Sequence, residues 1–185
     1  MEPKVKVLES DKIYLRPFEP GDAPILYQAM NSDKKLRRLT GTHKVFTLQE
    51  IEDFIRSSAA DSTRVGFAIV TQDDDTLVGD AALNEMVFPN NRDANFRIAI
   101  FDAFTSKGYG SEAAELMLEY GFGILNLHRI ELDVYSVNER AAHVYEKLGF
   151  KKEGVKRENW YYDHQYYDSV MMSILEHEYR ERKKK

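Results

Sequence analysis

The spacing of apolar residues in the first third of the chain predicts one strand and two helices. Apolar and other residues alternate over residues 12–18, which predicts a strand. After Asp22, apolar residues recur at helical spacing, which predicts a helix. Thr47 and Glu50 form a capping box, so we predict a second helix from Thr47 to about Ala59.

The remaining pattern alternates strands with helices and closes on a pair of strands. The predicted elements are strands at residues 65–71, 77–84 and 94–101, a helix at 111–125, a strand at 129–135, a helix from about 138 to 148, and two strands within 161–175 around a turn near 163–164. This order predicts a mixed α/β (α+β) sheet that is antiparallel early and contains a βαβ unit in its second half.

Length and composition indicate a single domain. With 185 residues, of which 43% are hydrophobic, the chain can bury one core but not two ordinary ones. We therefore expect one domain over residues 1–185, with flexible ends at about residues 1–10 and 180–185. The apolar runs are short, and the N-terminal residues are charged with no apolar signal segment, so we expect a cytoplasmic protein without membrane contact.

Charge and cysteine content narrow the chemistry. The net charge of −5 has the wrong sign for nucleic-acid binding and tolerates cationic small molecules. The basic run at residues 34–38 is interpreted as a solvated surface. The chain has no cysteine, so any thiol chemistry must come from a cofactor, and the five histidines lack metal-ligand spacing, so we expect no metal site.

A glycine-rich loop precedes the predicted helix at 111–125. Gly108 and Gly110 allow a tight turn whose N–H groups, together with the positive end of the helix, would bind a phosphate or pyrophosphate. Two other interpretations stand beside this one: a turn without a ligand, and a dinucleotide fingerprint completed by Ala113 with Glu131 or Asp133. The dinucleotide interpretation is the weakest, because the motif begins past the middle of the chain.

The segment after the strand at 129–135 carries a more specific pattern. Asn138, Ala141, Tyr145, Gly149 and Phe150 form N-x-x-A-x-x-x-Y-x-x-x-G-F, and here the chain resembles the GNAT N-acetyltransferases. The resemblance covers nearly the whole chain and is greatest to the branch of spermidine N-acetyltransferases and ribosomal-protein N-terminal acetyltransferases. It implies a mostly antiparallel twisted sheet of about six to seven strands, flanked by about four helices, with a central βαβ unit.

The resemblance also implies a co-substrate, acetyl-CoA, and the residues that bind it. The strand end at 98–101 would pair with pantetheine, the loop at 105–111 would bind pyrophosphate, and Asn138 would seat the pantetheine arm. The implied binding residues are Ile98, Ile100, Phe101, Thr105, Ser106, Lys107, Gly108, Tyr109, Gly110, Ser111 and Asn138. Thr105 stands where the family usually has Gln or Arg, so the expectation rests on the backbone amides of the loop.

Acetyl transfer to an amine requires a base and benefits from an acid. An aliphatic amine of pKa about 10.4 must lose a proton, and the departing thiolate has a parent pKa of about 8.5. By resemblance, Tyr145 faces the sulfur and acts as the acid, although its stripe with Val144 and Leu148 also suits a core residue. Glu85 is the candidate base, or else a solvated residue at a strand end, and Asn95 cannot accept a proton where many relatives have Glu.

Several acceptors and one different class of function remain open at this point. By resemblance the acceptor is a polyamine such as spermidine, and the alternative is the N-terminus of a peptide or ribosomal protein. A non-catalytic acyl-CoA-binding sensor would instead have its acceptor cleft plugged by aromatic residues from 161–167. We expect direct transfer in a ternary complex, and the lack of cysteine excludes a cysteinyl acyl-enzyme. By resemblance, the exposed strands of this fold also suggest a homodimer.

Overall fold

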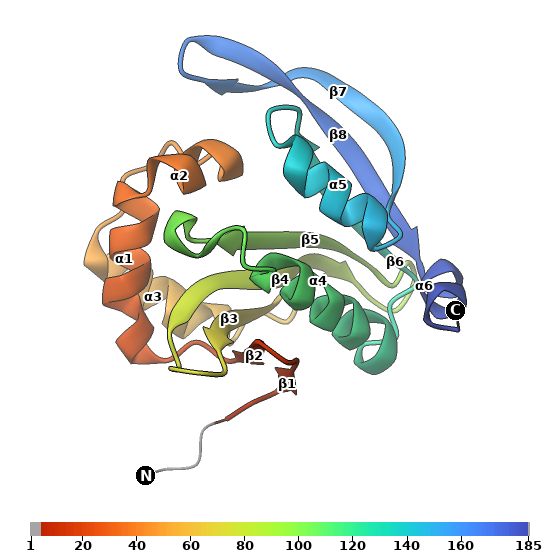
Figure 1. Cartoon of the computed structure of the whole chain (residues 1–185), viewed down its shortest axis with the longest axis horizontal. Helices are drawn as coiled ribbons and strands as arrows, with labels where there is room; N and C mark the ends of the chain where they lie inside the picture. Colours follow the sequence, from red (N-terminus) through yellow and green to blue (C-terminus); the bar gives the residue numbers. More distant parts are fainter. Residues whose placement is uncertain (1–4, 185) are drawn as a thin grey trace.

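Eight strands form one twisted sheet in a computed structural model that describes residues 5–184 (Figure 1). The strands are β1 (Leu8–Glu9), β2 (Ile13–Arg16), β3 (Val65–Thr71), β4 (Leu77–Val87), β5 (Asp93–Ile100), β6 (Arg129–Tyr135), β7 (Lys151–Tyr162) and β8 (Gln165–Leu175). The helices are α1 (Ala23–Ser32), α2 (Lys34–Thr40), α3 (Leu48–Ser58), α4 (Tyr109–Glu119), α5 (Glu139–Lys147) and α6 (Glu176–Lys183).

The strand order is β1-β2-β3-β4-β5-β6-β8-β7, and β5–β6 is the one parallel pair among the described strands. This arrangement confirms the predicted mixed, mostly antiparallel sheet with a βαβ unit, here β5-α4-β6. It also rules out the doubly wound parallel sheet that a dinucleotide site requires, so that interpretation of the glycine-rich loop is wrong.

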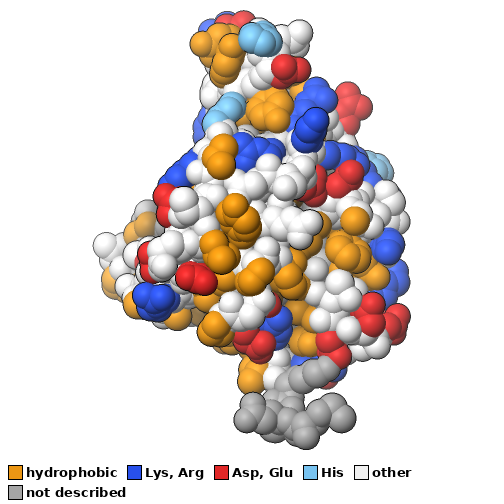
Figure 2. Space-filling view, turned by 90° about the vertical axis from the view of Figure 1, so that its left-hand side faces the viewer, with side chains coloured by type: hydrophobic (Ala, Val, Ile, Leu, Met, Phe, Trp, Pro, Cys, Tyr) orange, Lys and Arg blue, Asp and Glu red, His pale blue; other side chains and the backbone are white. Residues whose placement is uncertain are grey.

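Apolar residues alternate between two cores, one on each side of the sheet. Ile69 on β3 belongs to the core under α4, whereas its neighbours Ala68 and Val70 belong to the core shared with α1, α2 and α3. Such alternation is expected for a strand covered on both sides. Figure 1 shows the consequence: α1–α3 gather beside one end of the sheet, α4 crosses the other face, and the β7–β8 hairpin projects beyond α5. The end of this hairpin forms the narrow upper part of the molecule in Figure 2.

Local signals set the helix boundaries. The capping box predicted at Thr47 is present, with the Thr47 hydroxyl accepting from the Glu50 N–H and the Glu50 carboxylate accepting from the Thr47 N–H. Asp33 caps α2 by accepting from the Leu36 N–H at 2.9 Å. Gly41 ends α2 with φ of +67°, a conformation that other residues adopt with strain.

The structure adds elements near both ends of the chain. β1 lies within residues 5–10, just after Val7, whose N–H donates to the Leu15 carbonyl at 2.8 Å, and α6 extends to Lys183. Residues 1–4 and 185 lie outside the described part. Residues 5–184 form eight strands and six α-helices rather than the expected six to seven strands and four helices, because β1, α2 and α6 have too little apolar periodicity to be predicted.

A buried ion pair joins β2 to the start of α1. The Arg16 guanidinium donates to both carboxylate oxygens of Asp22, at 2.7 and 2.8 Å, and both residues are at most 9% exposed. The Asp22 carboxylate also accepts from the Glu19 N–H at 2.8 Å. Because each charge is desolvated, its partner is required to offset the cost of burial.

Asp22→Asn is therefore expected to lower the free energy of unfolding by about 3 kcal/mol, since the buried Arg16 charge keeps only the looser ion pair between its Nε and the exposed Glu19 carboxylate, at 3.8 Å, among the described carboxylates. Urea unfolding followed by circular dichroism measures this loss. The matched control is Asp53→Asn, which removes the exposed partner of Arg56 and should cost less than about 1 kcal/mol. Equal losses in the two variants would contradict the role assigned to the buried pair.

Candidate active site

The site begins where β5 and β6 separate. The two strands pair over three residues only, Asp93 to Asn95 opposite Arg129 to Glu131, and β5 then continues to Ile100 without a neighbour on that side. The Phe101 N–H donates to the Val78 carbonyl on the β4 side. Because hydrogen-bonding directions alternate along a strand, the backbone groups of Ile98 and Ile100 point into the gap.

A pocket of about 540 Å³ occupies this gap, between α2, β5, the loop before α4, and α5. Its lining residues are Lys35, Leu36, Arg38, Leu39, Thr40, Ile98, Ala99, Ile100, Asp102, Phe104, Thr105, Ser106, Gly108, Tyr109, Gly110, Ser111, Val137, Asn138, Glu139, Arg140, Ala141, Val144 and Tyr145. One wall is apolar, from α5 and β5, and the other end is polar, from the loop. Such a pocket suits a long ligand with an anionic end.

The loop before α4 forms the polar end. Ser106 has φ of +68° and Gly108 has φ of +91°, and α4 begins directly after Gly108. These conformations turn successive N–H groups toward the pocket, where the first turn of α4 adds its own unpaired N–H groups. The Thr105 hydroxyl is occupied within the loop, donating to the Asp102 carbonyl at 3.0 Å, so the loop presents backbone rather than the Thr105 side chain.

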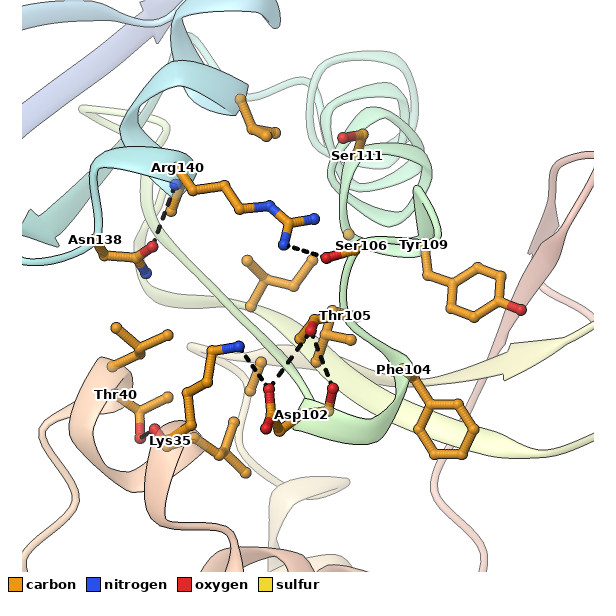
Figure 3. A pocket seen from close by; sticks show the side chains of 18 of the residues that line it. Lys35, Thr40, Asp102, Phe104, Thr105, Ser106, Tyr109, Ser111, Asn138 and Arg140 are labelled. Atoms are coloured by element: carbon orange, nitrogen blue, oxygen red, sulfur yellow. Dashed lines mark hydrogen bonds and ion pairs between the residues drawn. The ribbon is translucent and has the colours of Figure 1, made fainter.

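Three cationic side chains that the sequence did not single out as site residues also line the pocket. Arg140 reaches from α5 across to Ser106 and donates to its hydroxyl at 2.7 Å, and Lys35 reaches from α2 to Asp102 at 2.6 Å (Figure 3). Arg38 on α2 is the third. Arg140 lies two residues after Asn138 within the N-x-x-A-x-x-x-Y motif, so its position in the sequence could have identified it. Lys35 and Arg38 belong to the basic run at 34–38, which the sequence alone indicates to be a solvated surface.

Asn138 and Tyr145 both lie on the α5 side of the pocket. Asn138 is the N-cap of α5, and its side chain accepts from the Ala141 N–H at 3.2 Å. The Tyr145 ring packs edge-on against Phe96 at 6.3 Å and lies 5.7 Å from the ring of Phe150. Burial raises the pKa of Tyr145 to about 12, so its hydroxyl stays protonated throughout the neutral range.

Three predicted site residues lie outside the pocket. Phe101 is buried and faces a second, smaller pocket, and Lys107 is exposed, with its ammonium 5.3 Å from the centre of the Phe104 ring. Glu85 is an exposed residue with φ of +55°, beyond the register shift on β4 and at the closed end of the β5–β6 gap. The structure therefore does not bring Glu85 to the lining of either pocket.

The structure supports neither a metal site nor a membrane-spanning helix within residues 5–184. Within residues 5–184, no cluster of three or more His, Asp or Glu side chains is arranged to hold a metal ion. Every helix in the same range is too short or too polar to span a lipid bilayer.

Comparison with known proteins agrees with this geometry. Residues 12–151 match the acetyltransferase (GNAT) domain family. The spermidine N(1)-acetyltransferase of Escherichia coli (strain K12) is 31% identical over 170 residues, which cover 90% of this chain and 88% of that protein. YoaA, an uncharacterized N-acetyltransferase of Bacillus subtilis (strain 168), is 27% identical over 91% of this chain and 96% of its own length.

A solved structure extends the likeness to three dimensions. The crystal structure of spermidine N-acetyltransferase from Vibrio cholerae, in complex with CoA and spermine, superposes with a TM-score of 0.86 at 28% identity. The match covers 92% of this chain and 99% of that one. The chain therefore belongs to the GNAT acetyltransferase family and is an acetyl-CoA-dependent N-acetyltransferase.

Proposed function

We propose that the protein moves an acetyl group from acetyl-CoA directly onto a primary amine, with both substrates bound at once. The observation that carries this proposal is the gap between β5 and β6, whose unpaired backbone groups meet an anion-binding loop within one pocket. The pantetheine arm would run along Ile98 and Ile100, and the pyrophosphate would lie against Ser106 to Ser111. Arg140, now hydrogen-bonded to Ser106, is placed to turn toward a phosphate.

The reaction requires two protons to leave the acceptor. As the C–N bond of the amide forms and the C–S bond of the thioester breaks, the ammonium loses one proton to solvent through a base and the other ends on the CoA sulfur. A backbone N–H of β5 that faces the gap is suited to hold the carbonyl oxygen as its negative charge grows. The apolar wall that α5 and β5 form limits the access of water to the thioester.

Tyr145 is the residue that we assign to the leaving sulfur. Outright proton loss from a hydroxyl of pKa about 12 to a thiolate of parent pKa about 8.5 is uphill by roughly 3.5 pKa units. The hydroxyl therefore acts as a hydrogen-bond donor that stabilises the thiolate while it forms. The same raised pKa keeps this donor available over the whole range in which acceptor amines lose their protons.

Two acceptor classes have support. The similarity to spermidine N-acetyltransferases favours a polyamine such as spermidine. The charge of α2 favours a less cationic amine or a peptide N-terminus, because Lys34, Lys35, Arg37 and Arg38 lie beside the pocket or on the same short helix. A non-catalytic sensor is less well supported, because the rings of Tyr161 and Tyr166 pack on one another at the exposed hairpin end rather than in the pocket.

Tyr145→Phe is expected to lower kcat by about a hundredfold, because the thiolate loses its hydrogen-bond donor, while KM for acetyl-CoA changes less than about threefold. Thiol release from acetyl-CoA measures both constants. Because the pKa of Tyr145 is about 12, ionisation of this group should not lower the wild-type rate at any pH below 10. Tyr166→Phe, on the exposed hairpin, should leave kcat unchanged, and an unchanged kcat in Tyr145→Phe would refute the assignment.

Gly108→Ala is expected to weaken acetyl-CoA binding by about five- to thirtyfold. A Cβ atom at φ of +91° costs about 1–2 kcal/mol, and it would lie 3.0 Å from the Lys12 ammonium, so the loop would relax away from the phosphates. Isothermal titration calorimetry measures the dissociation constant. In Gly123→Ala, where an added Cβ meets no atom within 4 Å, binding should match the wild type. Unchanged binding in Gly108→Ala would contradict the role of the loop.

A further inference from the structure

The main pocket is lined from both sides of the sheet. Tyr145 packs against the core under α4, whereas Leu36 and Ala99 belong to the core shared with α1–α3, and all three line the pocket. Figure 3 shows Thr40 on α2 and Asn138 on α5 at opposite sides of it. A molecule held in the gap between β5 and β6 therefore has α5 on one side and α2 on the other.

This arrangement determines which residues the acyl chain of the donor would meet. With the sulfur beside Tyr145 and the carbonyl group at the backbone of β5, the chain would leave the carbonyl carbon on the side away from the sulfur. That side is the one covered by α2. The residues that close the pocket there, here called the α2 wall, are Leu36, Leu39, Thr40 and Ala99.

Behind the α2 wall lies a second, much smaller cavity. Its volume is about 10 Å³, which is room for about one water molecule and so for no more than one further carbon of an acyl chain. Leu36, Thr40 and Ala99 line both cavities and therefore separate them. Asp80 and Arg97 line the smaller cavity as an ion pair of 3.1 Å, with Asp80 only 8% exposed, so a longer chain would meet buried charge.

Hydrogen bonds hold the α2 wall in place at Leu36. The Leu36 N–H donates to the Asp33 carboxylate at 2.9 Å, and the Leu36 carbonyl accepts from the Thr40 hydroxyl at 2.8 Å. The Asp33 carboxylate also accepts from the Asp102 N–H at 2.7 Å, which joins α2 to the segment after β5. The Leu36 side chain is 8% exposed, so it is enclosed by its neighbours. Moving this wall to admit a longer chain would therefore strain a packed core.

We propose that Leu36 limits the acyl-chain length of the donor, so that the protein transfers acetyl groups, tolerates propionyl groups and excludes butyryl and longer groups. This proposal rests on the proposed function and specifies its donor. The third carbon of a propionyl group needs about the space that the smaller cavity offers, whereas the fourth carbon of a butyryl group would overlap the α2 wall or the pair of Asp80 and Arg97. For each chain the same C–N bond forms and the same C–S bond breaks, with one proton of the ammonium lost through a base and the other ending on the CoA sulfur.

The test is a thiol-release assay with acetyl-CoA, propionyl-CoA and butyryl-CoA, each with spermidine, short peptides and L-amino acids as acceptors. For the acceptor with the highest rate, we expect kcat/KM with propionyl-CoA to be within about tenfold of that with acetyl-CoA, and kcat/KM with butyryl-CoA to be at least about a hundredfold lower. In Leu36→Ala, which joins the two cavities, the ratio of butyryl to acetyl transfer should rise at least tenfold. Mass spectrometry identifies the acylated product.

Two further variants separate chain-length selection from a general loss of packing. Leu26→Ala is the matched control, because Leu26 is 3% exposed in the same core but lines neither cavity, and the ratio of butyryl to acetyl transfer should stay at the wild-type value. Leu36→Val removes less volume, so it retains the fold if Leu36→Ala does not, and the ratio should rise at least threefold.

Two outcomes would overturn the proposal while leaving acetyl transfer intact. One is wild-type butyryl transfer as fast as acetyl transfer, and the other is an unchanged ratio in both Leu36 variants. Isothermal titration calorimetry with acetyl-CoA, which needs no acceptor, distinguishes these outcomes from a failure of the proposed function. Absence of acetyl-CoA binding, or of acetyl transfer to every amine, would contradict the proposed function itself.

Discussion

The parting of β5 from β6 is the constraint on which the rest of the molecule depends. Two strands that stayed paired would satisfy one another's backbone groups, and no ligand could enter between them. Here the pairing stops at Asn95 and Glu131, so Ile98 and Ile100 present unsatisfied N–H and C=O groups to a pocket. Such groups favour a partner that resembles a peptide chain, because hydrogen bonds that water makes in the open gap must be replaced when the gap is filled.

The elements around the gap supply what the strands cannot. Helix α5 closes one side with Val144 and Tyr145, and α2 closes the other with Leu36 and Leu39. The loop before α4 adds N–H groups, and cations from α2 and α5 converge on it although the whole chain has a net charge of −5. The side chains at the loop are therefore positively charged although the whole chain is negative, as expected when a protein must attract a polyanionic substrate to one point.

Periodicity and capping carried most of the fold prediction. The strands at 65–71 and 129–135 have the predicted bounds because burial leaves a clear pattern in each sequence. β3 is a run of mostly buried residues, and β6 alternates between buried and more exposed residues. The capping box at Thr47 located α3. The first ten residues of β7 were missed because most are exposed on both faces, so no alternation marks them.

The candidate site was predicted only in part, for physical reasons. The motif around Asn138 and Tyr145, and the glycines of the loop, are local signals, and the structure brings both to one pocket. Glu85 is the candidate base because it aligns with a carboxylate near the active site of the polyamine acetyltransferases. Position along β4 decides which residue faces the gap, however, and the register of β4 cannot be obtained from a single strand. Asp80 shows what such a pattern does indicate: it is a lone charge inside the apolar run Leu77 to Leu83, where burial requires a partner, and Arg97 provides it at 3.1 Å.

We expect the gap between β5 and β6 to receive the pantetheine arm and the loop before α4 to receive the phosphates. Hydrogen exchange followed by mass spectrometry, with and without acetyl-CoA, measures both contacts in one experiment. On binding, exchange should slow in peptides that contain Ile98 to Phe101 and Thr105 to Ser111, with no change in β7. Protection confined to other segments, or acetyl-CoA binding without protection of β5, would contradict it.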